Sequence, residues 1–203
     1  VELIACSSTS VETRESLINF LLQINKRPFC QDESNPFILN RILLDLQAEA
    51  FHVISENMIS VFGLDELVKQ YILPAGVFEF FDHVGIDIML SSIESYMKYS
   101  LDREFYLPMI HSLHEMVGHN QLGIKTGKGF YDYKGLMRSS GDSVQYAEIP
   151  DQLRKKTVKR LWRRYEESYL RMLESGTCSR EELIVYLQDY LGIDRDPLTL
   201  KDL

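Results

Sequence analysis

The 203-residue sequence predicts a mainly α-helical fold that begins with a small β–α–β unit. Two observations favour this fold. The composition, 45% apolar and 26% charged, is typical of an ordinary folded domain. After about residue 35, apolar side chains recur every three to four residues, whereas only residues 1–6 and 28–31 have an extended, β-prone pattern.

The first thirty residues predict one β–α–β crossover. Residues 1–6 form the first extended segment, and Thr9 with Glu12 has the spacing of a capping box ahead of a helix over 10–24. Residues 28–31 form the second extended segment. Because a single unit of this kind cannot bury both of its faces, we expect residues 1–34 to be the terminal remnant of a nucleotide-binding domain that lies outside this chain.

Residues 35–136 predict a complete helical domain. Pro36 suits the first position of a long helix whose apolar period continues to about residue 62. Shorter helical patterns follow over 64–72, 77–83, 86–100 and 106–120. A glycine-containing turn over 123–129 then leads into aromatic residues that we expect to be extended.

The remaining residues predict a polar linker over 137–149 and further helices. A long helical pattern covers 150–173, and Ser179 with Glu182 has the spacing of a second capping box, which opens a helix to about residue 191. The order of a long helix, a break and a shorter helix faintly repeats the earlier region. We therefore interpret residues 150–203 as a partial, degenerate second helical repeat.

Composition excludes several classes of function. The 30 acidic and 22 basic residues give a net charge of −8, which disfavours binding to nucleic acid or to an anionic membrane. No apolar run approaches the length of a membrane span. The three cysteines are widely spaced, as expected for free thiols in a reducing compartment, so we predict a cytoplasmic protein.

Two polar residues gain interest from the motifs downstream of them. Taken alone, Glu2 is a solvated carboxylate at a strand end and Asn40 a polar residue on a helix. Farther along the chain, however, come the blocks PAGVFEFFDHVGID at 74–87 and LGIKTGKGFYDY at 122–133, in that order.

Together these residues resemble the C-terminal part of the NAD-dependent L-3-hydroxyacyl-CoA dehydrogenases, over about residues 1–133. The resemblance implies an N-terminal Rossmann domain that binds NAD, and a helical domain that mediates dimerisation and closes over the acyl-CoA substrate. It assigns Glu2 to the glutamate of a His–Glu catalytic pair and Asn40 to the active-site asparagine. The histidine, and the NAD site, would lie outside this chain.

The chemistry explains why such residues are needed. Oxidation of (S)-3-hydroxyacyl-CoA to 3-oxoacyl-CoA leaves a proton on oxygen, which a neutral imidazole takes as general base. Glu2 would fix the tautomer of that imidazole and stabilise its charged form. Asn40 would offer an amide N–H to the substrate oxygen. By itself the chain is expected to be inactive.

Other motifs have simpler interpretations. The glycines at 123–129 favour a tight structural turn over contact of Lys125 or Lys128 with a CoA phosphate, and GKG at 127–129 is no dinucleotide fingerprint, because position 132 is Asp. His114 and His119 are five residues apart, so they cannot face one ion on a helix. His111 and Glu115, four residues apart, are the alternative pair of metal ligands, but we predict a polar helix face and no metal site. The seven basic residues over 154–164 favour a solvated helix face, with an acidic partner as the alternative.

The sequence leaves three points open. Asn35, Pro36 and Val77 depart from the family pattern and put acyl-chain preference in doubt. If residues 150–203 fold back onto 35–120, they supply an intrachain pseudo-dimer; otherwise a homodimer is expected. The alternative function is a non-catalytic helical interaction module, in which Glu2 and Asn40 are incidental.

Overall fold

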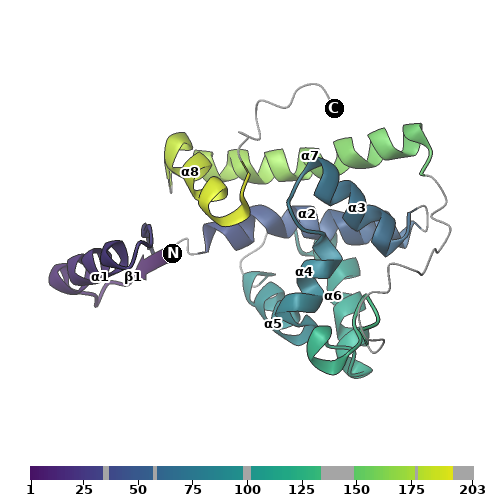
Figure 1. The fold of residues 1–203 in the computed structure, drawn as a ribbon, viewed down its shortest axis with the longest axis horizontal. Coiled ribbons are helices and arrows are strands. Elements are labelled where there is room, and N and C mark those ends of the chain that lie inside the picture. Colours follow the sequence, from purple (N-terminus) through teal and green to yellow (C-terminus); the bar gives the residue numbers. More distant parts are fainter. Residues whose placement is uncertain (34–36, 57–58, 98–101, 134–148, 177, 194–203) are drawn as a thin grey trace.

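A computed structural model describes residues 1–33, 37–56, 59–97, 102–133, 149–176 and 178–193. Most of these residues are helical, and two short strands lie near the N-terminus, which confirms the predicted fold class (Figure 1). Within the described residues, no helix is both long and apolar enough to cross a membrane. The proposed linker over 137–149 falls outside the described residues except for its last position, as do residues 194–203 of the predicted repeat.

The N-terminal unit is the expected β–α–β crossover. Strands β1 (Glu2–Ala5) and β2 (Phe29–Asp32) pair in parallel, with Glu2 opposite Phe29, and helix α1 (Val11–Gln23) connects them. Ser10, not Thr9, is the N-cap of α1, because its side chain accepts from the backbone N–H of Thr13. The predicted cap was therefore wrong by one residue: the Thr9 hydroxyl instead accepts from the backbone N–H of Cys6.

Much of the apolar surface of this unit is open. Leu3 of β1 and Leu21 of α1 are buried. Five large apolar residues of α1 and its flanks are instead exposed, by 43% to 71%: Val11, Leu17, Phe20, Leu22 and Ile24. Exposed apolar residues in this number make the surface of α1 a candidate for contact with another element.

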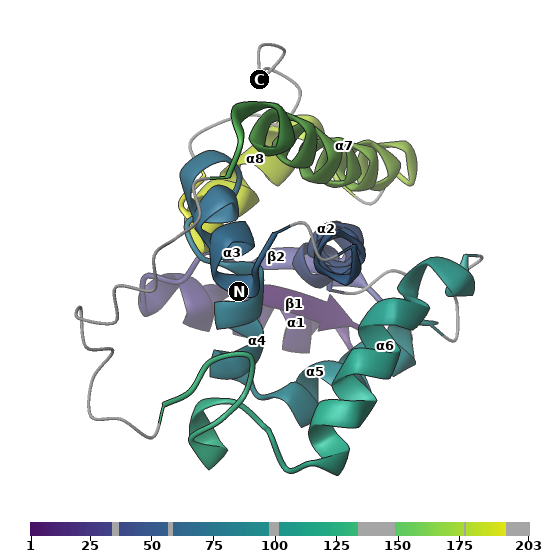
Figure 2. The same ribbon diagram turned by 90° about the vertical axis from the view of Figure 1, so that its right-hand side faces the viewer.

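Five helices form the next part of the chain. They are α2 (Ile38–Ser55), α3 (Val61–Tyr71), α4 (Val77–Val84), α5 (Ile86–Met97) and α6 (Arg103–Gly118). Figure 2 looks nearly along α2 and shows α7 (Asp151–Glu174) and α8 (Arg180–Leu191) on one side of it, with α5 and α6 on the other. Helix α2 is buried on most of its surface because other helices surround it.

Two predicted helix boundaries were wrong. The long helix ends at Ser55, not near residue 62, because the Ser60 side chain accepts from the backbone N–H of Gly63 and starts α3. Helix α6 begins at Arg103, three residues earlier than predicted, because Asp102 caps it through the N–H of Phe105. Apolar periodicity alone does not show where one helix stops when the next continues the pattern.

The glycine-containing turn packs against a buried carboxylate. Asp82 accepts from the backbone N–H groups of Phe130 and Tyr131, each at 2.9 Å, and from the hydroxyl of Tyr133. A Cβ atom added to Gly129 would overlap the Asp82 carboxylate, so only glycine fits there. The turn contains a short 3-10 helix, Ile124–Thr126. The aromatic residues after it do not form the expected extended strand, and only isolated bridges of Lys128 with Gly123 and Asp132 occur there.

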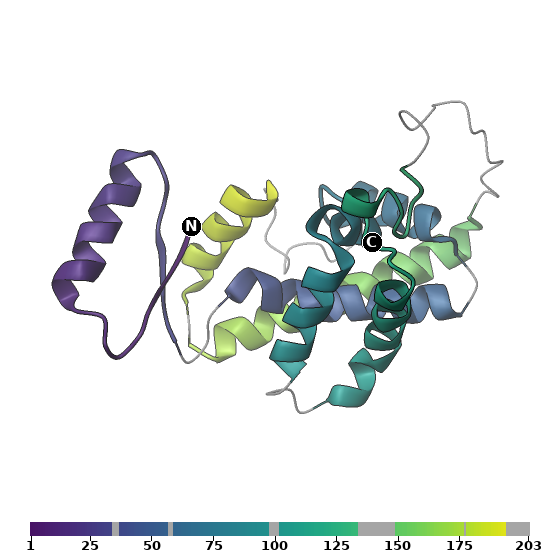
Figure 3. The ribbon, with the colours of Figure 1, turned by 90° about the horizontal axis from the view of Figure 1, so that it is seen from below.

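The last two helices return to the rest of the protein. Helix α7 runs along α2, and α8 lies between the β–α–β unit and the helical body (Figure 3). The predicted capping box of α8 is confirmed, since Ser179 and Glu182 each accept from the other's backbone N–H. Helix α7 therefore packs on α2 within the same chain.

Candidate functional site

The site is built at the N-terminus of α2. Phe37, the N-cap residue, has a left-handed backbone (φ 61°) and makes no side-chain capping bond. The first N–H groups of an α-helix have no partner within the helix, and the helix dipole is positive at this end. An uncapped N-terminus of this kind attracts a carboxylate. Asn35 and Pro36, two of the departures from the family pattern, lie outside the described residues.

Glu2 provides that carboxylate from the strand β1. Its Oε1 atom accepts a hydrogen bond from the backbone N–H of Leu39 at 3.3 Å. Because Leu39 directly precedes Asn40, this bond brings the two residues singled out from the sequence to one place. They come from different elements and are 38 positions apart in the chain.

Asn40 is exposed, and its amide is held by a tyrosine. Its Nδ2 atom donates to the hydroxyl of Tyr96, near the end of α5, at 3.0 Å. Burial raises the pKa of Tyr96, the bond from Asn40 opposes that shift, and the nearby Glu2 carboxylate adds to it. Arg41 lies beside the same group, and burial lowers its pKa.

This arrangement can support acid–base catalysis and can donate a hydrogen bond to a substrate. A carboxylate fixed by a helix N-terminus can accept a hydrogen bond from an imidazole and stabilise its protonated form. An amide with one N–H on Tyr96 keeps its second N–H for an oxygen that gains charge during a reaction. Both groups are reachable from outside, because Asn40 is exposed and Glu2 is only partly buried.

Helix α8 adds a third residue that the sequence analysis missed. Tyr186 is buried, and its ring stacks on Phe29 of β2 with the ring centroids 4.4 Å apart. Burial raises the pKa of Tyr186, and the neighbouring Glu2 carboxylate raises it further. Neither Tyr96 nor Tyr186 lies in a recognisable motif, so only the fold could reveal them.

The other motifs from the sequence have structural roles. Lys125 forms an ion pair with Asp87, while Thr126 bonds within the turn. His114 bonds to Glu94 at 2.8 Å, and His119 donates to the backbone carbonyl of Glu115. Among the described residues, no three His, Cys, Asp or Glu side chains gather as metal ligands would.

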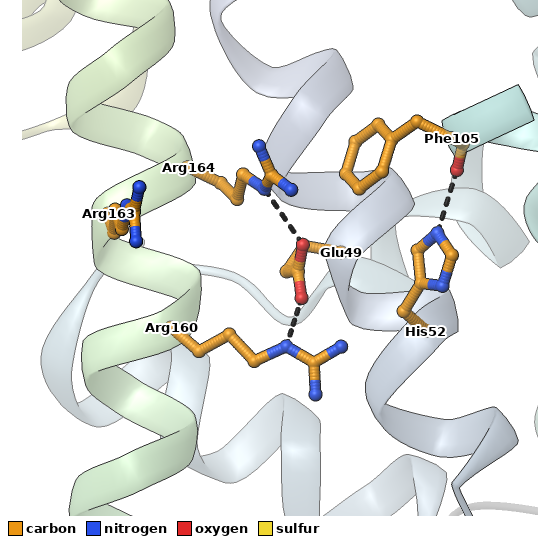
Figure 4. Close-up of a pocket in the computed structure, with 6 residues that line it drawn as sticks. All are labelled: Glu49, His52, Phe105, Arg160, Arg163 and Arg164. Carbon is orange, nitrogen blue, oxygen red and sulfur yellow. Dashed lines mark hydrogen bonds and ion pairs between the residues drawn. The ribbon is translucent and has the colours of Figure 1, made fainter. Parts of the chain in front are cut away.

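The basic run on α7 is divided, because Lys155, Lys156, Lys159 and Arg163 are exposed, as a solvated face requires, whereas two arginines turn toward α2. Arg160 and Arg164 both bind the buried carboxylate of Glu49 on α2, and Arg164 also lies over the ring of Phe105 (Figure 4). These residues line a cavity of about 340 Å³ together with His52 and Arg163. The arginines nearest α2 are therefore contacts between helices and not part of a solvated face.

Comparison with known proteins decides the family. The model of the "3-hydroxyacyl-CoA dehydrogenase, C-terminal domain" matches residues 37–133, which run from the N-cap of α2 to the end of the glycine turn. This part of the chain belongs to the 3-hydroxyacyl-CoA dehydrogenase family. The resemblance inferred from the sequence is confirmed.

Relatives of the dehydrogenase domain match a longer part of the chain than the family model does. The human mitochondrial hydroxyacyl-coenzyme A dehydrogenase is 33% identical over 135 residues, which are 66% of this chain and 43% of the human protein. The crystal structure of (S)-3-hydroxybutyryl-CoA dehydrogenase from Ralstonia eutropha is 33% identical over 65% of this chain and 46% of that one, with a TM-score of 0.56. The chain thus matches less than half of the length of these relatives.

One solved structure also covers α7 and α8. The crystal structure of 3-hydroxybutyryl-CoA dehydrogenase from Escherichia coli aligns with 98% of this chain and 59% of that one, with a TM-score of 0.72. The identity is only 18%, so this comparison shows the fold alone. The whole arrangement, including the helices beyond the dehydrogenase C-terminal domain, occurs in that protein.

Proposed function

We propose that the intact protein oxidises (S)-3-hydroxyacyl-CoA to 3-oxoacyl-CoA, with NAD as hydride acceptor, and that this chain is its C-terminal, substrate-binding region. The observation that carries the proposal is the bond from the N–H of Leu39 to the Glu2 carboxylate, which places Glu2 beside Asn40. In a helical interaction module, nothing would require these two residues to meet.

Each residue has a defined task in this reaction. Glu2 accepts a hydrogen bond from the imidazole of the general base, so that the other ring nitrogen faces the substrate hydroxyl. Asn40 donates its free N–H to the substrate oxygen as the carbonyl forms. The base itself would be a histidine of the nucleotide-binding domain, as the resemblance implies.

Within the described residues, the glycines do not form a turn that would hold the phosphates of NAD. The closely spaced glycines at 127–129 form a turn against Asp82 and do not lie between a strand and a helix. We therefore propose that an upstream Rossmann domain binds NAD and packs against α1. The five exposed apolar residues of α1 and its flanks support this arrangement.

We further propose that residues 150–203 are a partial second repeat, joined through 137–149 to the helical domain at 35–136. Helix α7 lies on α2, where the second subunit of a homodimer would otherwise pack, so the repeat serves as an intrachain pseudo-dimer. Residues 1–34 are the remnant of the nucleotide-binding domain in this division.

The physiological setting is also a proposal. Fatty-acid oxidation is the pathway that matches a 3-hydroxyacyl-CoA substrate. The three free cysteines suit a reducing compartment, and we propose that this compartment is the cytoplasm. The mammalian relatives are named as mitochondrial proteins.

The test is a dehydrogenase assay on the complete protein, nucleotide-binding domain included. Asn40→Ala should lower kcat by about 10²-fold with a smaller change in KM, because the lost bond acts mainly in the transition state. Glu2→Gln should lower kcat by a similar factor, because a neutral amide does not stabilise the imidazolium.

Glu104→Gln on the exposed first turn of α6 is the matched control, and it should keep the wild-type rate. The 203-residue chain alone should not turn over 3-hydroxybutanoyl-CoA. Wild-type kcat in both site variants, or turnover by the chain alone, would contradict the proposed function.

A further inference from the structure

One face of the small sheet carries both Glu2 and an aromatic partner for α8. Glu2 and Phe29 are partners in the parallel pairing of β1 and β2, and partners across a sheet point to the same face. The Tyr186 ring stacks on the Phe29 ring. Tyr186 therefore lies over the face from which Glu2 reaches α2.

Helix α8 is tied to this unit by further contacts. The Arg27 guanidinium, just before β2, forms an ion pair with Asp189 of α8 at 2.8 Å. Tyr190 packs against Tyr186 with the ring centroids 4.5 Å apart. In Figures 1 and 3, α8 lies next to the start of α2 and beside the N-terminal unit.

The Tyr186 hydroxyl is buried without a partner. Tyr186 is 3% exposed, and within the described part of the chain its hydroxyl has no hydrogen-bond partner. A buried hydroxyl in this state is costly, so it needs an explanation. The Glu2 carboxylate is partly buried on the same face and can accept a hydrogen bond from this hydroxyl.

We propose that Tyr186 is a positioning residue for Glu2, whose carboxylate it holds by a hydrogen bond from its hydroxyl when the imidazole of the general base docks. Hydrogen bonds in a catalytic group often tighten only when the complex forms. This inference rests on the proposed function. It makes α8, which lies outside the matched residues 37–133, a working part of the site and not only packing.

The raised pKa of Tyr186 agrees with this geometry. Burial is its main cause, and the Glu2 carboxylate adds to it, as expected when a hydroxyl proton faces a negative charge. The proton stays on Tyr186, which can then donate but cannot act as a base.

The contact is tested first on the complete protein, nucleotide-binding domain included, without any assay of activity. The Fermi doublet of tyrosine in the Raman spectrum reports whether a hydroxyl donates. Subtracting the spectrum of Tyr186→Phe from that of the wild type isolates Tyr186. We expect a donating hydroxyl, and a weaker donor when the same subtraction is made in the Glu2→Gln background.

Tyr165→Phe is the matched control for this measurement. Tyr165 of α7 is also buried with no described partner for its hydroxyl, but Glu2 is not among the groups that shift its pKa. Its difference spectrum should be the same in both backgrounds. An unchanged Tyr186 spectrum in the Glu2→Gln background would overturn the proposed contact.

The role in catalysis is tested on the complete protein. Tyr186→Phe should lower kcat by about tenfold or more at nearly constant KM, which is the effect of one hydrogen bond to a charged group. Tyr165→Phe should keep the wild-type kcat. An active wild type with an equally active Tyr186→Phe variant would refute the inference alone, whereas an inactive wild type would refute the proposed function and the catalytic role of Tyr186 with it.

Discussion

Asp82 shows how one residue can hold a motif together. It is 1% exposed, and its two carboxylate oxygens accept from two consecutive backbone N–H groups of the glycine turn. Asparagine has only one oxygen and would direct an N–H₂ group at one of these donors. We expect Asp82→Asn to lower the free energy of unfolding by about 1–3 kcal/mol, measured by urea denaturation near neutral pH.

The pH dependence of this loss is a sharper part of the same prediction. Burial raises the pKa of Asp82 above 3.8, so the folded state binds the proton more tightly than the unfolded chain. The stability that this proton adds to the folded state is fully present below pH 3.8 and is lost as the pH rises through the folded-state pKa. Asp82→Asn should therefore lower the free energy of unfolding more near pH 4 than near pH 7.

Asp87 provides a control, because its pKa is shifted in the opposite direction from that of Asp82. The hydrogen bond from Lys125 lowers the pKa of Asp87 below 3.8. The stability that the Asp87 carboxylate adds is therefore present above pH 3.8 and is lost as the pH falls through the folded-state pKa. The cost of Asp87→Asn should thus shrink in acid. Parallel pH profiles for the two variants would be incompatible with this account.

At the residue scale, the sequence allowed part of the site to be predicted. Glu2 and Asn40 could be singled out because family motifs lie at fixed positions after them. Tyr96 and Tyr186 could not, because a tyrosine on a helix is most often a core residue. Only the packing of α5 and α8 brings the Tyr96 hydroxyl to Asn40 and the Tyr186 ring onto Phe29.

At the scale of elements, the contact between α2 and α7 depends on buried charge. Glu49 of α2 has a side chain only 4% exposed, and it binds Arg160 and Arg164 from α7. Asp45, one turn earlier, binds Ser168 and Arg171 from the same helix. Charged partners on facing helices fix their register, because a shifted helix would leave a carboxylate buried without a partner.

We expect Glu49→Ala to lower the free energy of unfolding by about 2 kcal/mol, which is less than a fully buried pair would lose because both arginines reach solvent. Glu167→Ala is the control. Glu167 also binds Arg164, but its side chain is 31% exposed, so a loss below about 1 kcal/mol is expected. Equal losses by urea denaturation would show that burial does not set the strength of these pairs.

Element boundaries show why sequence patterns predicted helices better than their ends. The helical period continues from α2 into α3, and the break is decided by a single hydroxyl, that of Ser60. The Ser179 capping box was predicted correctly because both partners of that motif are visible in the sequence. A cap formed by one side chain, such as Ser10, competes with its neighbours and is easily misplaced by one residue.

At the scale of the whole molecule, the sequence left the placement of residues 150–203 open. Faint repetition suggested a second helical unit, but helical segments resemble one another and do not specify where they dock. The fold-back of α7 depends on contacts more than 100 positions apart, such as Glu49 with Arg160 and Asp45 with Arg171. Pairings of this range cannot be derived from local periodicity.

This arrangement predicts the oligomeric state. Because α7 covers α2 within one chain, the helical domain has no open face there for a second copy. The exposed apolar residues of α1 remain, and they would cause association of the chain when no upstream domain covers them.

We therefore expect the double variant Phe20→Ser, Leu22→Ser to be a monomer of about 23.6 kDa by light scattering, and the unaltered chain to have a mass that rises with concentration. Serine at these exposed positions removes apolar area without creating a cavity, so circular dichroism should show unchanged helix content. A stable dimer of the double variant would mean that copies meet through the helical domain, and the intrachain pseudo-dimer would then be wrong.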